Sequence, residues 1–334
     1  LDDDALAGEA TARVLESAPD NKRALFVDAC ARLADPAAQA AACDSLAAIV
    51  ESRPRLLARP QMARPLVRAL ARIGPAACLP LRRAIAAHAD AHSLDLVAQV
   101  APWVEPSTLR ARLDMPCAPG EIDALRATAM ALTGDATAQG GDRARLLAQH
   151  AADRYSALCV AAFAADVPLM WPRRAAGARV RVVVLADAGE DSTSATSGSP
   201  RSTFESLLAA LQPLAERIEL SVGAFGSPQR AVEVLHSTSF VQARVTQMPA
   251  IPDFESARSL AATDADLLID ITGLARPNGP LLAARPARCV IAMADVPHLA
   301  PPLVDATLPQ DRGAWAATLA TLVVSVVIDR VSAS

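Results

Sequence analysis

Ionisable side chains in the last third of the chain occupy positions where they could do acid–base chemistry. Asp270 ends the apolar run Asp266–Asp270, and His298 lies in a proline-containing loop further along. Histidine and the carboxylic acids are common general acids and bases in enzymes. Asp270 and His298 are therefore the candidate catalytic residues. Each has a structural alternative, in which Asp270 satisfies backbone groups or caps a turn and His298 is an exposed loop residue.

The candidate substrate-binding residues are Arg276, Arg285 and Asn278, which follow Asp270 within one short stretch together with Arg288. Guanidinium groups bind phosphates and carboxylates through paired, charge-assisted hydrogen bonds. This stretch could therefore contact a phosphate or an acidic group of a partner. The alternative is that these arginines lie on the rim of a domain and contact no ligand.

Several kinds of site are not predicted by the sequence. The six cysteines include no C-x-x-C pair, and no Ser-His-Asp, zinc or Walker pattern is present. We expect no metal and no cofactor. The longest uncharged run, Gly313 to Ile328, is shorter than the roughly 20 residues that span a bilayer. We therefore expect no membrane span, and the unpaired cysteines indicate a reduced, cytoplasmic protein.

The composition indicates a folded chain that does not bind nucleic acid. Hydrophobic residues make up 52% of the 334 residues, which excludes wholesale disorder. Aromatic residues are only 3%, so Ala, Leu and Val must build the cores. The formal net charge of −4 argues against nucleic-acid binding.

Residues 178–330 alternate strand and helix patterns. The run Arg179–Asp187 is rich in β-branched valine and includes the apolar stretch Val182–Ala186, as in a buried parallel strand. Alternating strands and helices predict a doubly wound, mainly parallel sheet, whose ligands bind at the carboxyl ends of the strands. The loops after Asp187, Phe225, Asp270 and Asp295 are the ones to inspect. Further strands are predicted at Arg217–Phe225, Phe240–Thr246, Ala265–Gly273, Arg288–Asp295 and Val304–Pro309, and helices at Ser202–Glu216, Ser227–Ser237, Asp253–Thr263 and Asp311 to about Ile328.

Residues 1–170 show a different period, with apolar residues recurring every three or four positions. Proline and glycine interrupt this pattern at short intervals, for example at Pro36, Pro54 and Pro106. Short helices between such breaks predict antiparallel hairpins that stack into an irregular α-solenoid. An irregular helical bundle is the alternative, because no fixed repeat length is visible.

The segment Asp264–Asp311 resembles the first Rossmann-like lobe of the O-linked N-acetylglucosamine transferase family. In that family an aspartate-bearing strand is followed by a glycine, an Asn-Gly loop and an R-P-A segment before the next strand. The resemblance implies half of a GT-B glycosyltransferase fold behind tetratricopeptide-like helices. The matching positions here are Asp266–Asp270, Gly273, Asn278-Gly279, Leu281–Ala287, Pro297 and Asp305.

The chain also departs from the family pattern. The loop Ala188–Thr203 lacks the family's histidine, and Asp295–His298 stands where the family has a Gly-Tyr-Pro-Gly loop. The second lobe, which in the family binds the sugar nucleotide, is not recognisable after residue 311. We predict a mobile Ala188–Thr203 loop, because its Ser, Thr and Gly content buries little surface. We also predict that the C-terminal helix packs on its own lobe and leaves one edge for a partner.

Two functions follow from these observations. In the first, the chain is a degenerate glycosyltransferase-like protein that acts as a non-catalytic protein-binding or scaffold subunit. In the second, it is the acceptor-side lobe of a protein O-glycosyltransferase that uses a UDP-sugar, with the donor lobe on another chain or on a removed segment. The expected partner is a glycosyltransferase or its protein substrate, and the chain is expected to be inactive alone.

Overall fold

A computed structural model describes residues 2–73, 77–88, 93–135, 141–163, 178–187, 200–294 and 297–332. The chain forms two compact units, Leu1–Ala151 and Ala152–Ser334, which meet within helix α9 (Gly141–Phe163). The domain ranges 1–170 and 178–330 stay a prediction. Residues 188–199 of the loop predicted to be mobile lie outside the described residues.

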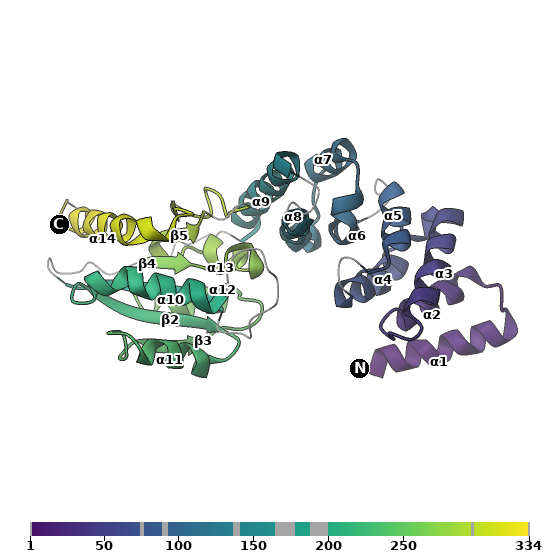
Figure 1. Cartoon of the computed structure of the whole chain (residues 1–334), viewed down its shortest axis with the longest axis horizontal. Helices are drawn as coiled ribbons and strands as arrows, with labels where there is room; N and C mark the ends of the chain where they lie inside the picture. The colour runs from purple at the N-terminus through teal and green to yellow at the C-terminus, as the bar shows by residue number, and fades with distance from the viewer. Residues whose placement is uncertain are drawn as a thin grey trace. The chain divides into compact units, whose positions relative to one another are not determined.

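The first unit is helical (Figure 1). Its main contacts join helices that are one or two positions apart along the chain, such as α2 with α3 and α4, or α6 with α8. Serial contacts of this kind are those of stacked helical hairpins. The helices before α9 are α1 (Asp2–Ser17), α2 (Lys22–Arg32), α3 (Gln39–Ser52), α4 (Pro60–Arg72), α5 (Leu79–Ala87), α6 (Leu94–Val100), α7 (Pro106–Asp114) and α8 (Ile122–Asp135).

Caps and prolines explain where several of these helices begin. Asn21 caps α2, because its side chain accepts hydrogen bonds from the backbone N–H groups of Arg23 and Ala24. Pro60 and Pro106 are the first residues of α4 and α7. Proline suits that position, since its missing N–H would have no helical partner there. Of the prolines that interrupt the apolar pattern in the sequence, Pro106 therefore starts a new α-helix.

The second unit is a parallel sheet covered by helices. Its six strands are hydrogen-bonded in the order β3-β2-β1-β4-β5-β6, and every neighbouring pair is parallel. The strands are β1 (Val180–Asp187), β2 (Ile218–Phe225), β3 (Arg244–Gln247), β4 (Ala265–Asp270), β5 (Ala287–Met293) and β6 (Ala306–Leu308). The helices are α10 (Pro200–Leu211), α11 (Pro228–His236), α12 (Phe254–Ala261), α13 (Gly279–Ala283) and α14 (Trp315–Ser332).

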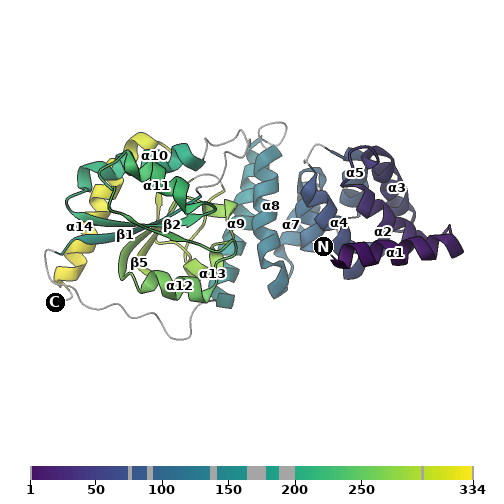
Figure 2. The same cartoon turned by 90° about the horizontal axis from the view of Figure 1, so that it is seen from below.

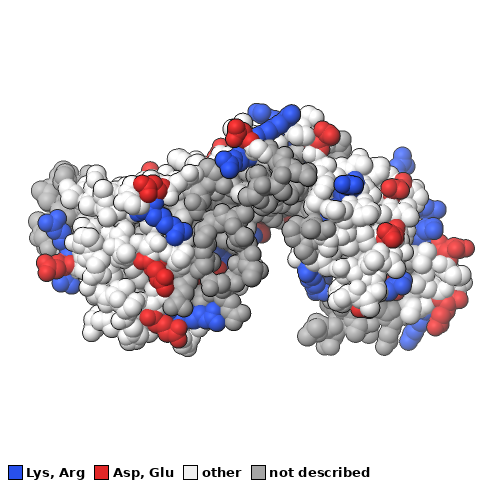
Figure 3. Space-filling view, in the orientation of Figure 1, with Lys and Arg blue, Asp and Glu red and all other residues white. Residues whose placement is uncertain are grey.

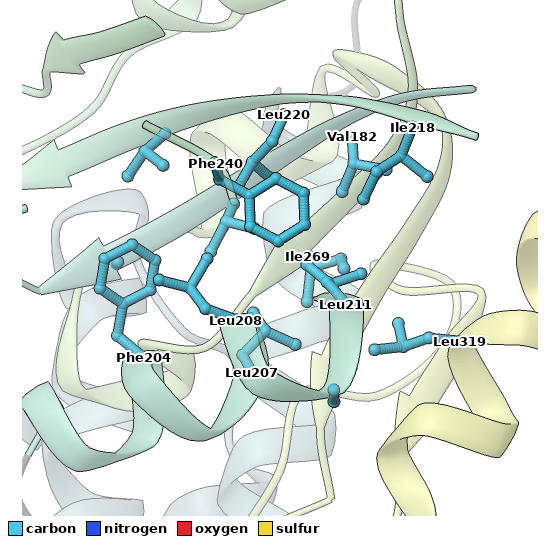
Figure 4. Close-up of a cluster of buried hydrophobic side chains, with 14 of the residues drawn as sticks. Val182, Phe204, Leu207, Leu208, Leu211, Ile218, Leu220, Phe240, Ile269 and Leu319 are labelled. Carbon is cyan, nitrogen blue, oxygen red and sulfur yellow. The ribbon is translucent and has the colours of Figure 1, made fainter. Parts of the chain in front are cut away.

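Helices cover both faces of the sheet. Figure 2 shows α10, α11 and α14 on one face and α12 and α13 on the other. Alternate residues of each strand point to opposite faces, so Val182 and Ile269 contribute to the core beneath α10 (Figure 4). Residues 266, 268 and 270 of β4 point to the other face. A helical region followed by a Rossmann-like α/β unit is the architecture expected from the sequence.

Two elements differ from the sequence-based expectation. The third strand begins at Arg244 rather than Phe240, because residues 237–243 form turns that place the Phe240 ring in the core. Helix α13 was not predicted at all. It has only five residues, which is too short for a helical period to be visible in the sequence.

Helix α14 packs on its own unit, as predicted. Trp315, Leu319 and Val323 are buried among side chains of α10 and the sheet, and the Trp315 indole Nε1 donates to the Pro309 carbonyl at 2.7 Å. Val324 is 46% exposed. Among the described residues, neither α14 nor any other helix is long and apolar enough to cross a membrane.

Replacing Leu319 with alanine is expected to lower the free energy of unfolding by about 2–5 kcal/mol, because the cavity left in a packed core adds to the lost burial. Leu319 is fully buried. The matched control is Val324→Ala on the exposed face of α14, with an expected change below about 0.5 kcal/mol. Urea titration followed by hydrogen exchange of β1 peptides measures both changes. Equal effects of the two substitutions would contradict this packing of α14.

Candidate functional site

The edge of the sheet formed by the carboxyl ends of β1 and β4 is the place to look for a ligand site. Strand order reverses between these two strands, and ligands of doubly wound sheets bind in the crevice at that point. Asp187 ends β1 and Asp270 ends β4. The loop that follows Asp270 then leads through Asn278 into α13.

Asp270 is fully buried and organises this loop. Its Oδ1 accepts hydrogen bonds from the Thr272 backbone N–H at 2.9 Å, the Thr272 hydroxyl at 2.7 Å and the Gly273 N–H at 3.3 Å. The Asn278 amide, only 1% exposed, donates to both oxygens of Asp270 at 3.3 Å and to the Thr272 hydroxyl oxygen at 2.7 Å. These contacts form an Asx-type turn that carries the chain from β4 toward α13.

Burial raises the pKa of the Asp270 carboxyl, and the hydrogen bonds from Thr272, Asn278 and Gly273 act in the opposite direction. A general base must come within hydrogen-bond reach of the proton that it removes. Asp270 cannot reach a bound ligand unless the Asp270–Thr272–Asn278 network opens. In the structure this carboxyl is fully engaged by hydrogen bonds within the loop.

Arg276 lies at the same edge of the sheet and contacts the end of β1. Its Nε and Nη2 donate to Asp187 Oδ2 at 2.9 and 2.6 Å. Its guanidinium carbon lies 5.5 Å from the centre of the Phe225 ring at the end of β2, within the range of a cation–π contact. Arg276 thus joins the ends of β1 and β2 to the loop after β4, and its charge is balanced by Asp187.

Comparisons with known proteins assign no family. No family model matches the chain, and no curated protein matches it. Among solved structures, it is similar to a mutant of the Thermobaculum terrenum O-GlcNAc transferase, at 16% identity and a TM-score of 0.42. The match covers 88% of this chain and 51% of the other, so the chain spans about half the length of that transferase. A TM-score this low does not establish a common fold.

Arg285 lies at the opposite edge of the sheet, at the amino ends of β5 and β6. Its Nη2 donates to the two oxygens of Asp305 at 2.9 and 2.7 Å. Asp305 Oδ2 also accepts from the Val290 N–H at 2.7 Å. Asp266 lies near the amino end of β4, where its Oδ2 accepts from the Arg181 N–H at 2.8 Å. Arg285 precedes β5 and Asp266 lies near the start of β4, whereas Asp270 lies at the carboxyl end of β4.

His298 lies on the connection between β5 and β6 and is partly buried. The connection is held by α9, since the Ala300 N–H donates to the Ser156 hydroxyl oxygen at 3.0 Å. Asp295 and Val296 lie outside the described residues. The structure therefore brings Asp270, Asn278 and Arg276 together at one edge and keeps Arg285 apart from them.

Sequence reasoning missed three contributors to this site. Thr272 and Asp187 complete the networks of Asp270 and Arg276, and the Asp-x-Thr spacing of an Asx turn was the available signal for Thr272. Tyr155 of α9 is 2% exposed, and its hydroxyl oxygen accepts from the Gly279 N–H at 3.0 Å. No sequence pattern links Tyr155 to a residue that far along the chain. Among the described residues, no three His, Cys, Asp or Glu side chains are arranged to hold a metal ion.

Proposed function

We propose that the chain is a degenerate glycosyltransferase-like protein that acts as a non-catalytic protein-binding or scaffold subunit. One observation carries this proposal. At the strand-order reversal between β1 and β4, the polar side chains that a ligand would need are bound to each other. Asp270 and Asn278 are buried in one network, and Arg276 is paired with Asp187 and stacked on Phe225.

The chemistry of a sugar-nucleotide donor explains why this arrangement disfavours catalysis. Its diphosphate needs unpaired cationic or N–H donors, and the Arg276 charge is already balanced by a carboxylate 2.6 Å away. Breaking that pair to admit a phosphate would leave Asp187 near a second anion. Binding of a sugar nucleotide at this edge would therefore break both the ion pair of Arg276 with Asp187 and its contact with the Phe225 ring.

The partner in this proposal is another protein chain, either a glycosyltransferase or its protein substrate. The described part of the face in Figure 3 shows acidic and basic side chains interspersed, without the continuous basic tract that follows a nucleic-acid backbone. The six cysteines are all free thiols, which supports a location in the reducing cytoplasm.

Titration of the chain with UDP-N-acetylglucosamine tests the proposal by isothermal calorimetry. We expect no measurable heat of binding, because among the described residues no unpaired cation lies beside Asp270 to receive the diphosphate. The titration is repeated with the Arg276→Ala variant, and again with the wild-type chain mixed with a candidate acceptor protein. The heats of binding in the three titrations are then compared.

Micromolar binding that Arg276→Ala abolishes would overturn the non-catalytic function. Sugar transfer to the acceptor that is lost in Asp270→Asn or His298→Ala would support the acceptor-side lobe instead. Each outcome is read by calorimetry or by intact-protein mass spectrometry, so the two functions give different results.

A further inference from the structure

A concave basic site lies in the helical unit, far along the sequence from the candidate residues of the sheet. It is formed by the turn before α2 and the start of that helix, together with the segment that joins α3 to α4. Its volume is about 690 Å³. Five of the lining side chains are cationic and one is acidic: Lys22, Arg23, Arg53, Arg55 and Arg59 against Asp20. We call these five cations the basic pocket.

The basic pocket stands out against the rest of the chain. The formal net charge is −4, and Lys22 is the only lysine. All five cationic residues are exposed. By contrast, the buried Arg82 donates to the Ala77, Gln99 and Leu70 carbonyls. Within the described part of the chain, no ion pair or side-chain hydrogen bond joins a basic-pocket cation to another protein group.

Helix ends add to the positive potential of this site. Asn21, Lys22 and Arg23 are the N-cap and first two residues of α2, and Arg59 is the N-cap of α4. The amino end of a helix carries a partial positive charge from its unpaired N–H groups. Two such ends and five like-charged side chains repel one another in the free protein. A negatively charged ligand would remove that repulsion.

We propose that the basic pocket binds an acidic segment of a partner protein, a run of aspartate and glutamate side chains. Arginine predominates, and its planar guanidinium pairs with a carboxylate through two parallel hydrogen bonds. Small-molecule sites are mostly apolar and enclose their ligand, whereas this site is lined by exposed charges. An extended segment that keeps contact with water fits such a surface better. The inference gives the partner's chemistry and in that respect rests on the protein-binding function proposed above.

A fluorescent hexaglutamate peptide is the probe, with its anisotropy measured on titration of the full chain at about 50 mM salt, where exposed charges are weakly screened. We expect saturable binding that weakens as salt is raised. The double variant Arg23→Glu with Arg55→Glu is expected to reduce the affinity at least about tenfold, because it places acidic groups opposite the peptide.

The matched control is Arg83→Glu with Arg110→Glu, which changes the net charge equally on α5 and α7, outside the basic pocket. Both arginines are exposed. The control is expected to keep at least half of the affinity, and circular dichroism melting checks that both variants fold. An equal loss in the two double variants, or no binding by the wild-type chain, would overturn the inference.

Competitors separate this ligand from other anions. Pyrophosphate that displaces the peptide at a lower concentration than hexaglutamate itself would assign the site to a small polyphosphate and overturn the proposal. Tighter binding of an oligothymidylate through the same arginines would assign the site to nucleic acid and would also overturn the proposal. The UDP-sugar titration is interpreted by its dependence on Arg276, whereas peptide binding is interpreted by its dependence on Arg23 and Arg55. Failure of this inference and failure of the proposed function therefore give distinct results.

Discussion

Replacing Asp270 with alanine is expected to lower the free energy of unfolding of the sheet unit by roughly 3–5 kcal/mol, because it leaves several buried donors without an acceptor. Those donors are the N–H groups of Thr272 and Gly273 and the amide of Asn278. Urea titration with hydrogen exchange read on β1 and β4 peptides measures the change, and peptides of α3 serve as an internal reference. The control Glu255→Ala removes a carboxylate that is 74% exposed and should be nearly neutral.

The pH dependence of stability gives this prediction a second measurement. Burial raises the pKa of Asp270 above its ordinary value of 3.8. The folded state then binds more protons than the unfolded state between those two pKa values, so stability is lost as pH rises through that window. The Asp270→Asn variant does not titrate there. The stability of the wild type relative to this variant should be greater at about pH 4 than at about pH 7.

Two results would contradict this account of Asp270. One is a relative stability that rises with pH, which would contradict the raised pKa, because it would indicate a carboxylate stabilised by its hydrogen bonds more than it is penalised by burial. The other is an alanine variant that unfolds like the wild type but loses a sugar-transfer activity. That result would make Asp270 a group that contacts substrate.

The strands could be predicted because their residue types strongly favour a buried parallel strand over other secondary structure. The stretch Val182–Ala186 before Asp187 is apolar and rich in β-branched valine, and the structure buries all of it in β1. The same reasoning found β4 and placed Asp270 at its end. It could not predict that Asp270 is buried, because that depends on α13 covering the face toward which residue 270 points.

The contacts that decide function are long-range and leave no local pattern. Arg276 pairs with Asp187 across 89 positions of the chain, so the sequence showed only an arginine near an asparagine. The basic pocket was not found for the same reason. Lys22 and Arg23 are separated from Arg53 by two helices, and only the stacking of α2 and α3 brings their charges into one concave surface.

Replacing Gly279 with alanine is expected to destabilise the sheet unit by roughly 2–4 kcal/mol, because the added methyl group overpacks a filled site and disturbs a hydrogen bond. A Cβ at this position would lie 2.5 Å from the Tyr155 hydroxyl oxygen and also too close to Cys159 Sγ. The control is Gly120→Ala, where nothing lies within 4 Å of the added Cβ. Hydrogen exchange of β4 and α9 peptides in urea reports the change.

A double-mutant cycle shows whether the cost comes from this contact. Cys159→Ala removes the sulfur atom that meets the new methyl group, so the double variant with Gly279→Ala should be less destabilised than the sum of the two single variants. Such coupling requires α13 to be pressed against the end of α9. Strictly additive costs would mean that the two helices are not in contact. The Asn278-Gly279 pair would then be an open loop at the strand-order reversal, available to a ligand, and the non-catalytic function would lose its main support.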